Sequence, residues 1–556
     1  MSDHTVLPFE RHCDVAVIGG SAAGLGAALQ LGRQRRSVIV VDAGEPRNAP
    51  AARMHGYLGH EGVAPSQLLG TGQEEVRSYG GEVVAGRADR VTRHSEGRLR
   101  VELVGGHTII ARRVLAATGT IDQLPDIDGL AQQWGHGVIH CPFCHGYEAR
   151  DQRIVQIVTH PMGLHTARLI RQLTDRHTLI VDNNGAVDEA QLDTLRAGGA
   201  DIMRGQVTKI ISDNGGLLVA VEMSDGGRIP ADTVLIGPRF KARVEPFDAL
   251  GLHTIEHPSG LGDYVQTDAN GATNVPGLYA AGNVTDPSQQ MLAAAAAGSK
   301  VATMISFDLA EDDLQHRSRA SANETDWDHR YSGEQWWSGN PNGTLVNEIT
   351  SLTPGSALDV GAGEGGDAVW LAEHEWQVTA NDVSQRVLDR IEANATHRDL
   401  TIDCYHADAN MLDAFPPATY DLVTAFYASI PRTPDHRAVH TMIAAVAPGG
   451  TLLIVSHDLE PLRTPIDTHH DSQPFDPDAF LRTEHFAEAL TGITAMGHRS
   501  PRKAPPAAGG SRGHPPRRRH RAARPPPHNE LNRTSITTYF WPVEDPQVTQ
   551  LQMPAA

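Results

Sequence analysis

A glycine-rich turn that follows a short apolar run constrains the fold of this chain more than any other feature. Residues 13–18 are apolar, the turn at 19–24 follows at once, and an alanine-rich stretch leads to a second apolar run that ends in Asp42. This order is typical of a strand, a tight turn and a helix whose first amides hold a pyrophosphate, with an acid placed for ribose hydroxyls. It predicts an α/β nucleotide-binding domain, although an ordinary glycine-rich bend would share part of the pattern. The candidate cofactor-binding residues here are Gly19, Ser21, Ala23, Gly24 and Asp42, with Ser21 in place of the middle glycine.

Two of the four cysteines lie in the run HCPFCH at residues 140–145. Cys13 and Cys404 supply no second pair, and ligands packed on one short turn could hardly all reach one tetrahedral zinc ion, so we expect no metal site. A Cys-x-x-Cys pair among reduced thiols favours a redox couple instead. The proline after the first cysteine suits the first position of a helix, whose dipole would lower the pKa of a thiol at its start. The candidate catalytic residues are Cys141, Cys144, His140 and His145, the histidines acting either as bases or as a helix cap or packed ring.

Length and charge set the broad class of the protein. At about 150 residues per domain, the 556 residues correspond to roughly three or four domains. A formal net charge of −20 argues against nucleic acid as a main ligand. The sequence starts without the apolar core of a signal peptide, and no later run reaches membrane-spanning length. We therefore expect a cytoplasmic protein that does not bind a membrane.

Two further strand-and-turn patterns complete a family resemblance. The turns at residues 117–119 and 281–283, taken with the first glycine turn and the cysteine pair, resemble the thioredoxin-reductase-like flavoproteins in the order of their motifs. The resemblance covers residues 10 to 310 and implies FAD as cofactor and a homodimer. It implies an FAD domain made of segments 10–120 and 245–310, with an NAD(P)-like domain at 121–244 inserted between them. The further cofactor-binding candidates are Arg47, Asn48, Thr118, Gly119, Gly282 and Asn283, the last standing where the family usually has an aspartate.

By the same resemblance, Cys144 faces the flavin and Cys141 faces the substrate. The inserted domain should carry a second glycine fingerprint for NADPH, but the corresponding positions are Val158, His160 and Gly163. This loss speaks against NADPH. Together with the histidines it is similar to the gliotoxin-type dithiol oxidases, which use the position of His140 as a base. A reductase and an oxygen-dependent oxidase of small-molecule dithiols therefore both stay open, as does a non-catalytic flavin- or SAM-binding redox sensor.

A separate glycine motif begins after a polar linker predicted for residues 311–325. Its order of an acid before Gly-x-Gly-x-Gly, an acid ending the next strand and a later Pro-Gly-Gly turn resembles the class I SAM-dependent methyltransferases. The resemblance implies a Rossmann-like domain at 326–495 that binds S-adenosyl-L-methionine (SAM). Trp327, Tyr331, Trp336 and Trp337 would close over SAM or pack as ordinary core. The candidate SAM-binding residues are Asp359, Gly361, Gly363, Gly365, Asp382 and Asp408.

Residues 496–556 are basic and proline-rich, which predicts a disordered tail, with 535–541 as a possible strand. The whole chain is thus expected to be α/β, with two Rossmann-like FAD/NAD(P)-type domains of thioredoxin reductase architecture followed by a class I methyltransferase domain. We predict a bifunctional enzyme that acts on a thiol or disulfide of a small molecule or protein through FAD and carries a methyltransferase. Neither the substrate nor the methyl acceptor follows from the sequence.

Overall fold

The computed structural model describes residues 10–160, 163–181, 187–319, 323–333, 335, 339–457, 476–494 and 535–541. The chain divides into two compact units between Ala310 and Glu311. Each unit is built around parallel β-sheet and is described by itself.

The main sheet of the first unit has seven strands in the order β3-β2-β1-β6-β5-β4, and β19 also pairs with β6. Its strands are β1 (Glu10–Ile18), β2 (Val38–Asp42), β3 (Glu82–Ala85), β4 (Ala88–Arg93), β5 (Leu99–Leu103), β6 (Thr108–Ala116) and β19 (Leu278–Ala280). β19 enters the sheet from more than 160 residues further along the chain and pairs in parallel with β6, with Ala280 opposite Ala116. The predicted FAD segments 10–120 and 245–310 therefore contribute to one sheet.

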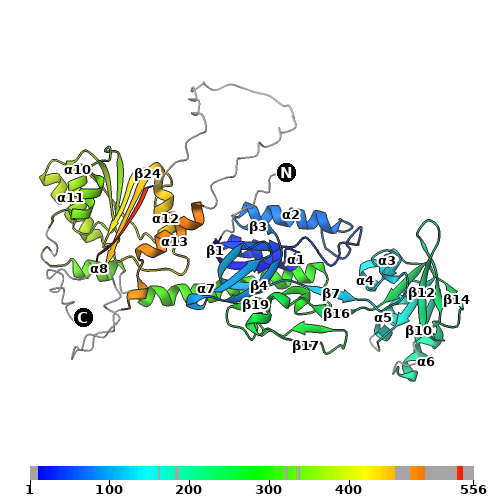
Figure 1. Ribbon diagram of the computed structural model, residues 1–556. Helices are drawn as coiled ribbons and strands as arrows, with labels where there is room; N and C mark the ends of the chain where they lie inside the picture. The colour runs from blue at the N-terminus through cyan, green and yellow to red at the C-terminus, as the bar shows by residue number, and fades with distance from the viewer. Residues whose placement is uncertain are drawn as a thin grey trace, which may run out of the picture. The chain divides into compact units, whose positions relative to one another are not determined.

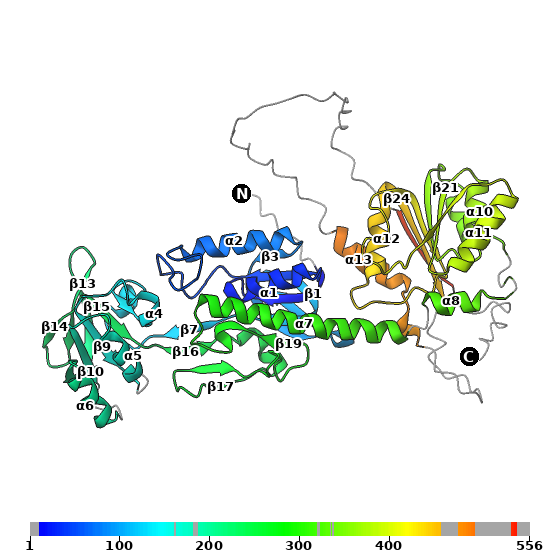
Figure 2. The ribbon, with the colours of Figure 1, turned by 180° about the vertical axis from the view of Figure 1, so that it is seen from behind.

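Helices α1 (Ala22–Arg33) and α7 (Met291–Arg319) cover one face of this sheet (Figures 1 and 2). Val15 and Val17 of β1 point to that face, whereas the alternate residues Ala16 and Ile18 belong to a second core on the other face. This alternation follows from the two-residue period of a strand, and burial on both faces explains why the run at 13–18 is continuously apolar. The remaining elements of this part are α2 (Pro65–Ser78), η1 (Ser95–Gly97), η2 (Glu245–Leu250), β17 (Thr254–Glu256), β18 (Asp263–Val265) and η3 (Gly282–Val284).

The inserted part begins and ends in a two-stranded antiparallel ribbon of β7 (Thr120–Gln123) and β16 (Arg239–Ala242). Between them lie a five-stranded parallel sheet of order β11-β10-β9-β15-β8 and a three-stranded antiparallel sheet of order β12-β13-β14. The strands are β8 (Val138–Ile139), β9 (Ile154–Val158), β10 (His177–Val181), β11 (Asp201–Arg204), β12 (Val207–Ser212), β13 (Leu218–Met223), β14 (Arg228–Pro230) and β15 (Thr233–Ile236). The helices are α3 (Leu130–Gln133), α4 (Pro142–His145), α5 (Gly163–Ile170) and α6 (Glu189–Ala197).

The second unit contains a six-stranded sheet of order β22-β21-β20-β23-β24-β25 whose neighbouring strands all pair in parallel. Its strands are β20 (Ser356–Val360), β21 (Gln377–Asp382), β22 (Ile402–His406), β23 (Tyr420–Phe426), β24 (Val446–His457) and β25 (Ser535–Trp541). Helices α10 and α11 pack on one face and α12 and α13 on the other (Figure 1). The helices are α8 (Glu324–Arg330), α9 (Gly343–Ile349), α10 (Gly366–Glu373), α11 (Gln385–His397), α12 (Arg437–Ala445) and α13 (Thr483–Thr494), with the short η5 (Pro477–Ala479).

Three expectations from the sequence need correction or restriction. The linker predicted for 311–325 is helical over most of its length, because α7 continues to Arg319 and α8 begins at Glu324; that it joins two domains stays a prediction. Residues 535–541 of the predicted tail form a strand, while the rest of 496–556 lies outside the described residues. By length and composition alone α7 could cross a membrane, contrary to the prediction that no run is long enough. Its buried side chains Ala302, Ile305 and Leu309 nevertheless belong to the core above the main sheet.

Candidate functional site

The cysteine pair lies at the start of α4, a helix of four residues in the first unit. Cys141 is its N-cap and Pro142 occupies the first helical position, as the sequence predicted. The Cys144 thiol donates a hydrogen bond to the Cys141 sulfur, and the amides of Phe143 and Cys144 also point to that sulfur, so the pKa of Cys141 falls to about 7. The same contact, together with burial, raises the pKa of Cys144 well above its usual range. One thiolate is therefore favoured, on Cys141, beside a protonated Cys144.

Gln290 also contributes to this thiolate. It directly precedes α7, and its side chain hydrogen-bonds the Cys141 sulfur. The first cysteine of the pair thus contacts the FAD-type part of the unit through the residue before α7. Sequence reasoning missed Gln290, although its place before an alanine-rich helix was a usable signal. Which cysteine faces the flavin stays a prediction.

His140 is held in a neutral state. Its ring stacks on Trp134 with centroids 5.6 Å apart, and Arg47 Nη2 lies 3.2 Å from His140 Nε2. A guanidinium has only donors, so Nε2 must accept and its lone pair is occupied. Burial, and next the charge of Arg47, lower the pKa of His140 to about 3. The predicted role of His140 as a base does not fit this geometry; the alternative of a packed ring does.

Arg47 connects the FAD-type part to the inserted part. Its Nε donates to Asp122 Oδ1 of β7 at 2.9 Å, and its Cζ lies 4.7 Å from the centre of the Phe240 ring in β16. With the contact to His140, the guanidinium thus binds both ribbon strands and the residue before the cysteine pair. The sequence placed Arg47 and Asn48 at the cofactor, and for both residues that role stays a prediction.

The first glycine turn forms a tight cradle between β1 and α1. Gly19 has a φ of +112°, and a Cβ there would lie 2.3 Å from the carbonyl oxygen of Ala117. A Cβ on Gly24 would lie 1.8 Å from the oxygen of Gly19, and one on Gly20 would meet the carboxylate of Asp42 at 2.7 Å. Ser21 caps α1 without a side-chain cap hydrogen bond, so its hydroxyl does not satisfy the helix itself. Gly20, just before α1, thus packs against Asp42, and the cradle fits a dinucleotide.

The other predicted cofactor residues lie against this cradle with two qualifications. A Cβ on Gly282 would come within 2.7 Å of Ala23 Cβ, and Gly119 has a φ of +69° with open space around it. Thr118, however, donates its hydroxyl to the Arg243 carbonyl at 2.6 Å. The amide nitrogen of Asn283 donates hydrogen bonds to three carbonyls of the turn before α7, the nearest being that of Gln289 at 2.9 Å. Its amide oxygen is the group left for a ligand.

The turn after β9 departs from a dinucleotide site, as the sequence indicated. The side-chain amide nitrogen of Gln156 on β9 donates hydrogen bonds to the Gly163 carbonyl and the Thr166 hydroxyl, at 2.7 and 2.8 Å. The ring of His160 lies against the loop at Gly260, where a Cβ would be 2.9 Å away. The described part of this turn is thus fixed by side-chain contacts, and the loss of a second dinucleotide site stays a prediction.

In the second unit, the glycine motif follows β20, and all three of its glycines have a left-handed backbone conformation. Gly361, Gly363 and Gly365 have φ of +68°, +53° and +82°. Asp359, at the end of β20, is buried; its Oδ1 accepts from Thr424, and Oδ2 has no hydrogen-bond partner among the described residues. Burial, and next the charge of Asp367, raise the pKa of Asp359 to about 8. A buried carboxylate oxygen without a partner, next to a glycine loop, fits a cationic ligand such as SAM.

The two other predicted acids lie at the carboxyl ends of neighbouring strands. Asp382 ends β21, and its two oxygens accept from the amides of Gly363 and Ser384 at 3.0 and 2.9 Å. Burial raises its pKa. Asp408 follows β22 and accepts from the amide of Asn410 at 2.8 Å. The structure thus brings the predicted SAM residues to one edge of the sheet.

The segment that follows α8 is held next to this glycine loop by hydrogen bonds. Arg390 of α11 donates to Glu364 and to the carbonyls of Tyr331 and Gly333, each at 2.6 Å. Tyr331 is buried, and its hydroxyl would lie 3.5 Å from a Cβ on Gly363. It stacks on Trp327 at 5.7 Å, so both suggested roles of these aromatics fit. Trp336 and Trp337 lie outside the described residues.

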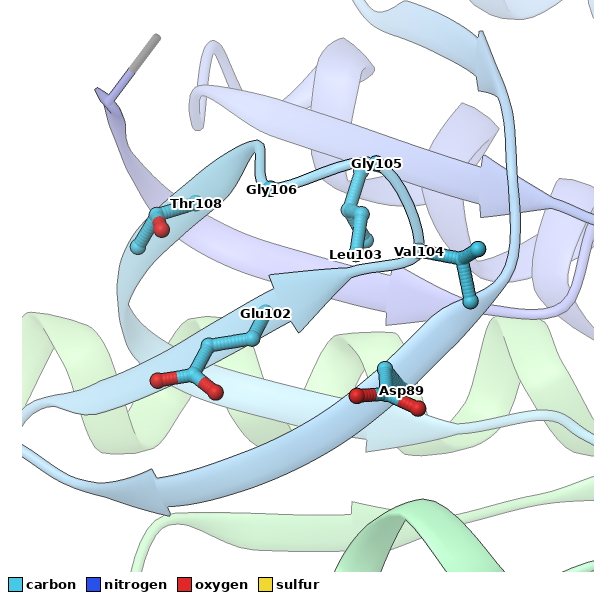
Figure 3. Close-up of a pocket in the computed structure, with 7 residues that line it drawn as sticks. All are labelled: Asp89, Glu102, Leu103, Val104, Gly105, Gly106 and Thr108. Atoms are coloured by element: carbon cyan, nitrogen blue, oxygen red, sulfur yellow. The ribbon is translucent and has the colours of Figure 1, made fainter. Parts of the chain in front are cut away.

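Two features outside the predicted sites bear on chemistry. Tyr427, directly after β23, has a φ of +53°, a conformation that non-glycine residues adopt rarely and often at functional sites. The hollow in Figure 3 contains none of the predicted site residues; it is lined by Asp89 of β4 and, at the turn from β5 to β6, by Glu102, Leu103, Val104, Gly105, Gly106 and Thr108. Within the described residues, no group of His, Cys, Asp and Glu is placed to hold a metal ion.

Comparisons with known proteins agree with this geometry. The family model described as pyridine nucleotide-disulphide oxidoreductase matches residues 13–299, and one described as methyltransferase domain matches 357–450. Thioredoxin reductase sirT of Leptosphaeria maculans is 29% identical over 324 residues, covering 55% of this chain and 98% of the relative. Thioredoxin reductase tcpT of Claviceps purpurea is 31% identical over 281 residues, covering 49% and 86%. The solved structure of HlmI is 38% identical with a TM-score of 0.52, covering 57% and 98%. These matches confirm the resemblance to the thioredoxin-reductase-like flavoproteins, the resemblance to the methyltransferases, and the predicted α/β fold class.

Proposed function

Because this chain belongs to the pyridine nucleotide-disulphide oxidoreductase family, we propose that its first unit is an FAD-dependent thiol/disulfide oxidoreductase that acts through Cys141 and Cys144. The observation that carries the proposal is the asymmetry of the pair. Cys141 caps the start of α4, and its sulfur accepts a hydrogen bond from the Cys144 thiol, which lowers the pKa of Cys141 and raises that of Cys144. A pair arranged in this way can attack a disulfide with one sulfur and resolve the product with the other.

The exchange needs both sulfurs in a fixed order. In the reducing direction, the Cys141 thiolate attacks a substrate disulfide, one substrate sulfur leaves as a thiolate, and a mixed disulfide forms. Cys144 then loses its proton and attacks Cys141 Sγ, which releases the second substrate sulfur and leaves the Cys141–Cys144 disulfide. In the oxidising direction, a substrate dithiol reverses these steps and leaves the enzyme pair reduced.

The glycine cradle supports FAD as the cofactor. Gly19, Ser21 and Gly24 would hold the pyrophosphate at the start of α1, and Asp42 would bind the ribose. Bound FAD would supply the two-electron acceptor or donor for the cysteine pair. Arg47 and Gln290 then have positioning roles, because they fix the residues before the pair and the Cys141 sulfur.

A titration tests the reaction and its direction. The oxidised flavin absorbance is followed without oxygen while NADPH is added to one sample and dithiothreitol to another. Bleaching by either reagent supports the oxidoreductase, and bleaching by neither overturns it. Bleaching by NADPH at a catalytic rate identifies a reductase.

A second candidate is an oxygen-dependent oxidase of small-molecule dithiols. It is favoured by the turn after β9, where Val158 and His160 stand at the two positions that glycines occupy in a dinucleotide fingerprint. This candidate predicts that a dithiol alone bleaches the flavin. Air then restores the colour with release of one hydrogen peroxide per dithiol oxidised, which a peroxidase-coupled dye measures.

For the second unit we propose a SAM-dependent methyltransferase that uses a small-molecule thiol as acceptor. Asp359, Asp382 and the left-handed glycines support SAM binding at the carboxyl edge of the sheet. Bound SAM would supply the methyl group, and the protein's task is to hold the acceptor in line with it. The thiol acceptor is suggested by the dithiol chemistry of the first unit. Calorimetric titration with SAM tests the binding, and transfer of a labelled methyl group to dithiothreitol tests the acceptor class.

A further inference from the structure

A loop of the FAD-type part, residues 54–63, places a histidine next to the cysteine pair. The loop is closed at its base by two backbone hydrogen bonds between Met54 and its end, from Met54 to Val63 and from Gly62 to Met54, each 3.0 Å long. Met54 is buried, so the base of the loop is anchored in the core. His55 follows directly and is therefore held by a fixed backbone.

The His55 ring is oriented by Glu61. His55 Nδ1 lies 2.6 Å from Glu61 Oε1, and the second carboxylate oxygen accepts from the Gly56 amide at 2.9 Å. These contacts lower the pKa of Glu61, the hydrogen bond from His55 contributing most. An ionised Glu61 accepts a hydrogen bond from Nδ1, so Nδ1 carries a proton. Nε2 is therefore the nitrogen that can exchange a proton.

The Nε2 side of the ring faces the segment that carries the cysteines. His55 Nε2 lies 3.6 Å from Glu148 Oε1, four residues after Cys144. The same loop contacts the residue that binds Cys141, because a Cβ on Gly56 would lie 3.4 Å from the Gln290 side-chain oxygen. His55 thus contacts the cysteine segment at Glu148, and the next residue of its loop, Gly56, lies near Gln290.

His145, adjacent to Cys144, completes the group. Its Nδ1 is buried and has no hydrogen-bond partner among the described residues. Burial, and next the charge of His55, lower the pKa of His145, while Glu148 raises it. The titratable groups that face His55 are therefore Glu61 from its own loop and His145 and Glu148 from the cysteine segment.

Thiol exchange at this site has to move protons. Oxidation of one substrate dithiol by the enzyme disulfide transfers two electrons to the cysteine pair. Of the two substrate protons, one re-forms the Cys144 thiol and the other leaves the site when Cys141 stays a thiolate; the reverse reaction takes that proton up. His140 cannot take this role, because Arg47 occupies its Nε2 lone pair. His55 has a carboxylate that orients it, a nitrogen open to exchange and an exposed carboxylate beside it that leads to solvent.

We propose that His55, oriented by Glu61, is the proton relay of the Cys141–Cys144 pair, with Glu148 as its path to solvent and His145 as the histidine adjacent to the thiols in the chain. The inference rests on the proposed function and deepens it. It predicts that a residue far from the cysteines in sequence controls how their reactivity depends on pH.

The test compares His55→Gln with a control in the same loop, His60→Gln. His60 is exposed and contacts the Tyr57 ring, outside the group around the cysteines. Two measurements are made from pH 5.5 to 9: the rate of anaerobic flavin reduction by dithiothreitol, and the rate at which iodoacetamide alkylates Cys141 in the reduced protein, followed by mass spectrometry. The second measurement does not depend on flavin turnover.

We expect His55→Gln to reduce flavin about tenfold more slowly at pH 7, to shift the alkylation midpoint of Cys141 to higher pH, and to regain rate when imidazole is added. Glu61→Gln keeps a hydrogen-bond acceptor. It should therefore change the rate of flavin reduction and the alkylation midpoint of Cys141 in the same directions, but by less. Unchanged pH profiles in His55→Gln overturn the relay while wild-type bleaching leaves the oxidoreductase intact. A wild-type flavin that dithiothreitol cannot reduce overturns the proposed function itself. An equal effect in His60→Gln also overturns the relay, because it would assign the change to the loop as a whole.

Discussion

Single residues of the same type take opposite roles in this protein according to what surrounds them. His140 and His55 both lie near the cysteine pair, but a guanidinium faces one ring nitrogen of the first and carboxylates face both nitrogens of the second. Cys141 and Cys144 differ in the same way, because each perturbs the other. At this scale function is set by hydrogen-bond partners rather than by residue identity.

Cys144→Ser should abolish electron transfer between thiols and flavin. The serine cannot attack Cys141 Sγ, so the exchange stops at the mixed disulfide. Stopped-flow absorbance measures flavin reduction by dithiothreitol. In a separate sample, mass spectrometry of the variant incubated with a small disulfide such as cystamine should find the mixed disulfide trapped on Cys141. Cys404→Ser, which changes a cysteine of the other unit, is the control and should react at the wild-type rate; flavin reduction in Cys144→Ser would contradict the assignment.

His177 in β10 should make the first unit sensitive to acid. Neither ring nitrogen has a hydrogen-bond partner among the described residues, and burial, with the charge of Arg171, lowers the pKa of His177 to about 4. Between pH 6.5 and 4 the unfolded chain binds the proton and the native state does not, so stability falls as pH falls, by at most about 3 kcal/mol. Urea unfolding at pH 7 and pH 5 should show a smaller loss in His177→Leu than in wild type or in the exposed control His165→Gln.

Asp359 should couple SAM binding to a proton. Its pKa of about 8 keeps the carboxyl neutral at pH 7 without ligand, whereas a cationic ligand favours the carboxylate. SAM affinity is therefore expected to rise by up to about tenfold per pH unit from 6 to 8 and then to level off. Calorimetry in two buffers of different ionisation enthalpy detects the released proton. Asp359→Asn should bind more weakly and without this slope; a wild-type affinity independent of pH would contradict the coupling.

At the scale of elements, close backbone contacts hold the cofactor cradle together. A Cβ on Gly298 of α7 would lie 1.9 Å from the Ala23 carbonyl of α1, and one on Gly26 of α1 would lie 2.6 Å from the Ala295 carbonyl. The two helices therefore touch through glycines from both sides. The alanine-rich composition of both helices permits this approach, and the start of each helix is positioned by it.

Gly298→Ala should separate α7 from α1 and weaken cofactor binding. Because the added methyl meets a backbone oxygen, we expect a loss of about 2 kcal/mol or more in the free energy of unfolding, together with flavin release. Gly70→Ala in α2 is a matched control: its Cβ meets nothing within 4 Å, and alanine should add up to about 1 kcal/mol of helix stability. Thermal unfolding and the flavin absorbance of the purified variants measure both effects. A stable, fully yellow Gly298→Ala protein would contradict the close contact.

At the scale of the whole molecule, the two units have separate sheets and separate cores, although α7 continues past the division at residues 310 and 311. Separate cores can unfold separately, which makes each transition report on one ligand. The homodimer and the cytoplasmic location expected from the sequence stay predictions.

Scanning calorimetry of the full chain should therefore show two transitions. SAM at about 100 times its Kd should stabilise only the methyltransferase unit, by about 2.7 kcal/mol, because it binds one native core. The transition that coincides with loss of the flavin spectrum should not move. A single transition that shifts as a whole would show that the two units unfold as one.

The sequence by itself determined the local elements of this protein. An apolar run, a glycine turn and an acid at a fixed distance are short-range patterns, so the turns at Gly19 and Gly361 and the helix start at Pro142 could be predicted. The tertiary structure alone decided what meets at the cysteine pair. Arg47, His55 and Gln290 lie roughly 85 to 150 residues from it along the chain, in segments without a spacing pattern, and only the folded contacts bring them to it. The state of a buried group such as His140 follows from those contacts, because desolvation and a neighbouring charge depend on distance in space rather than in sequence.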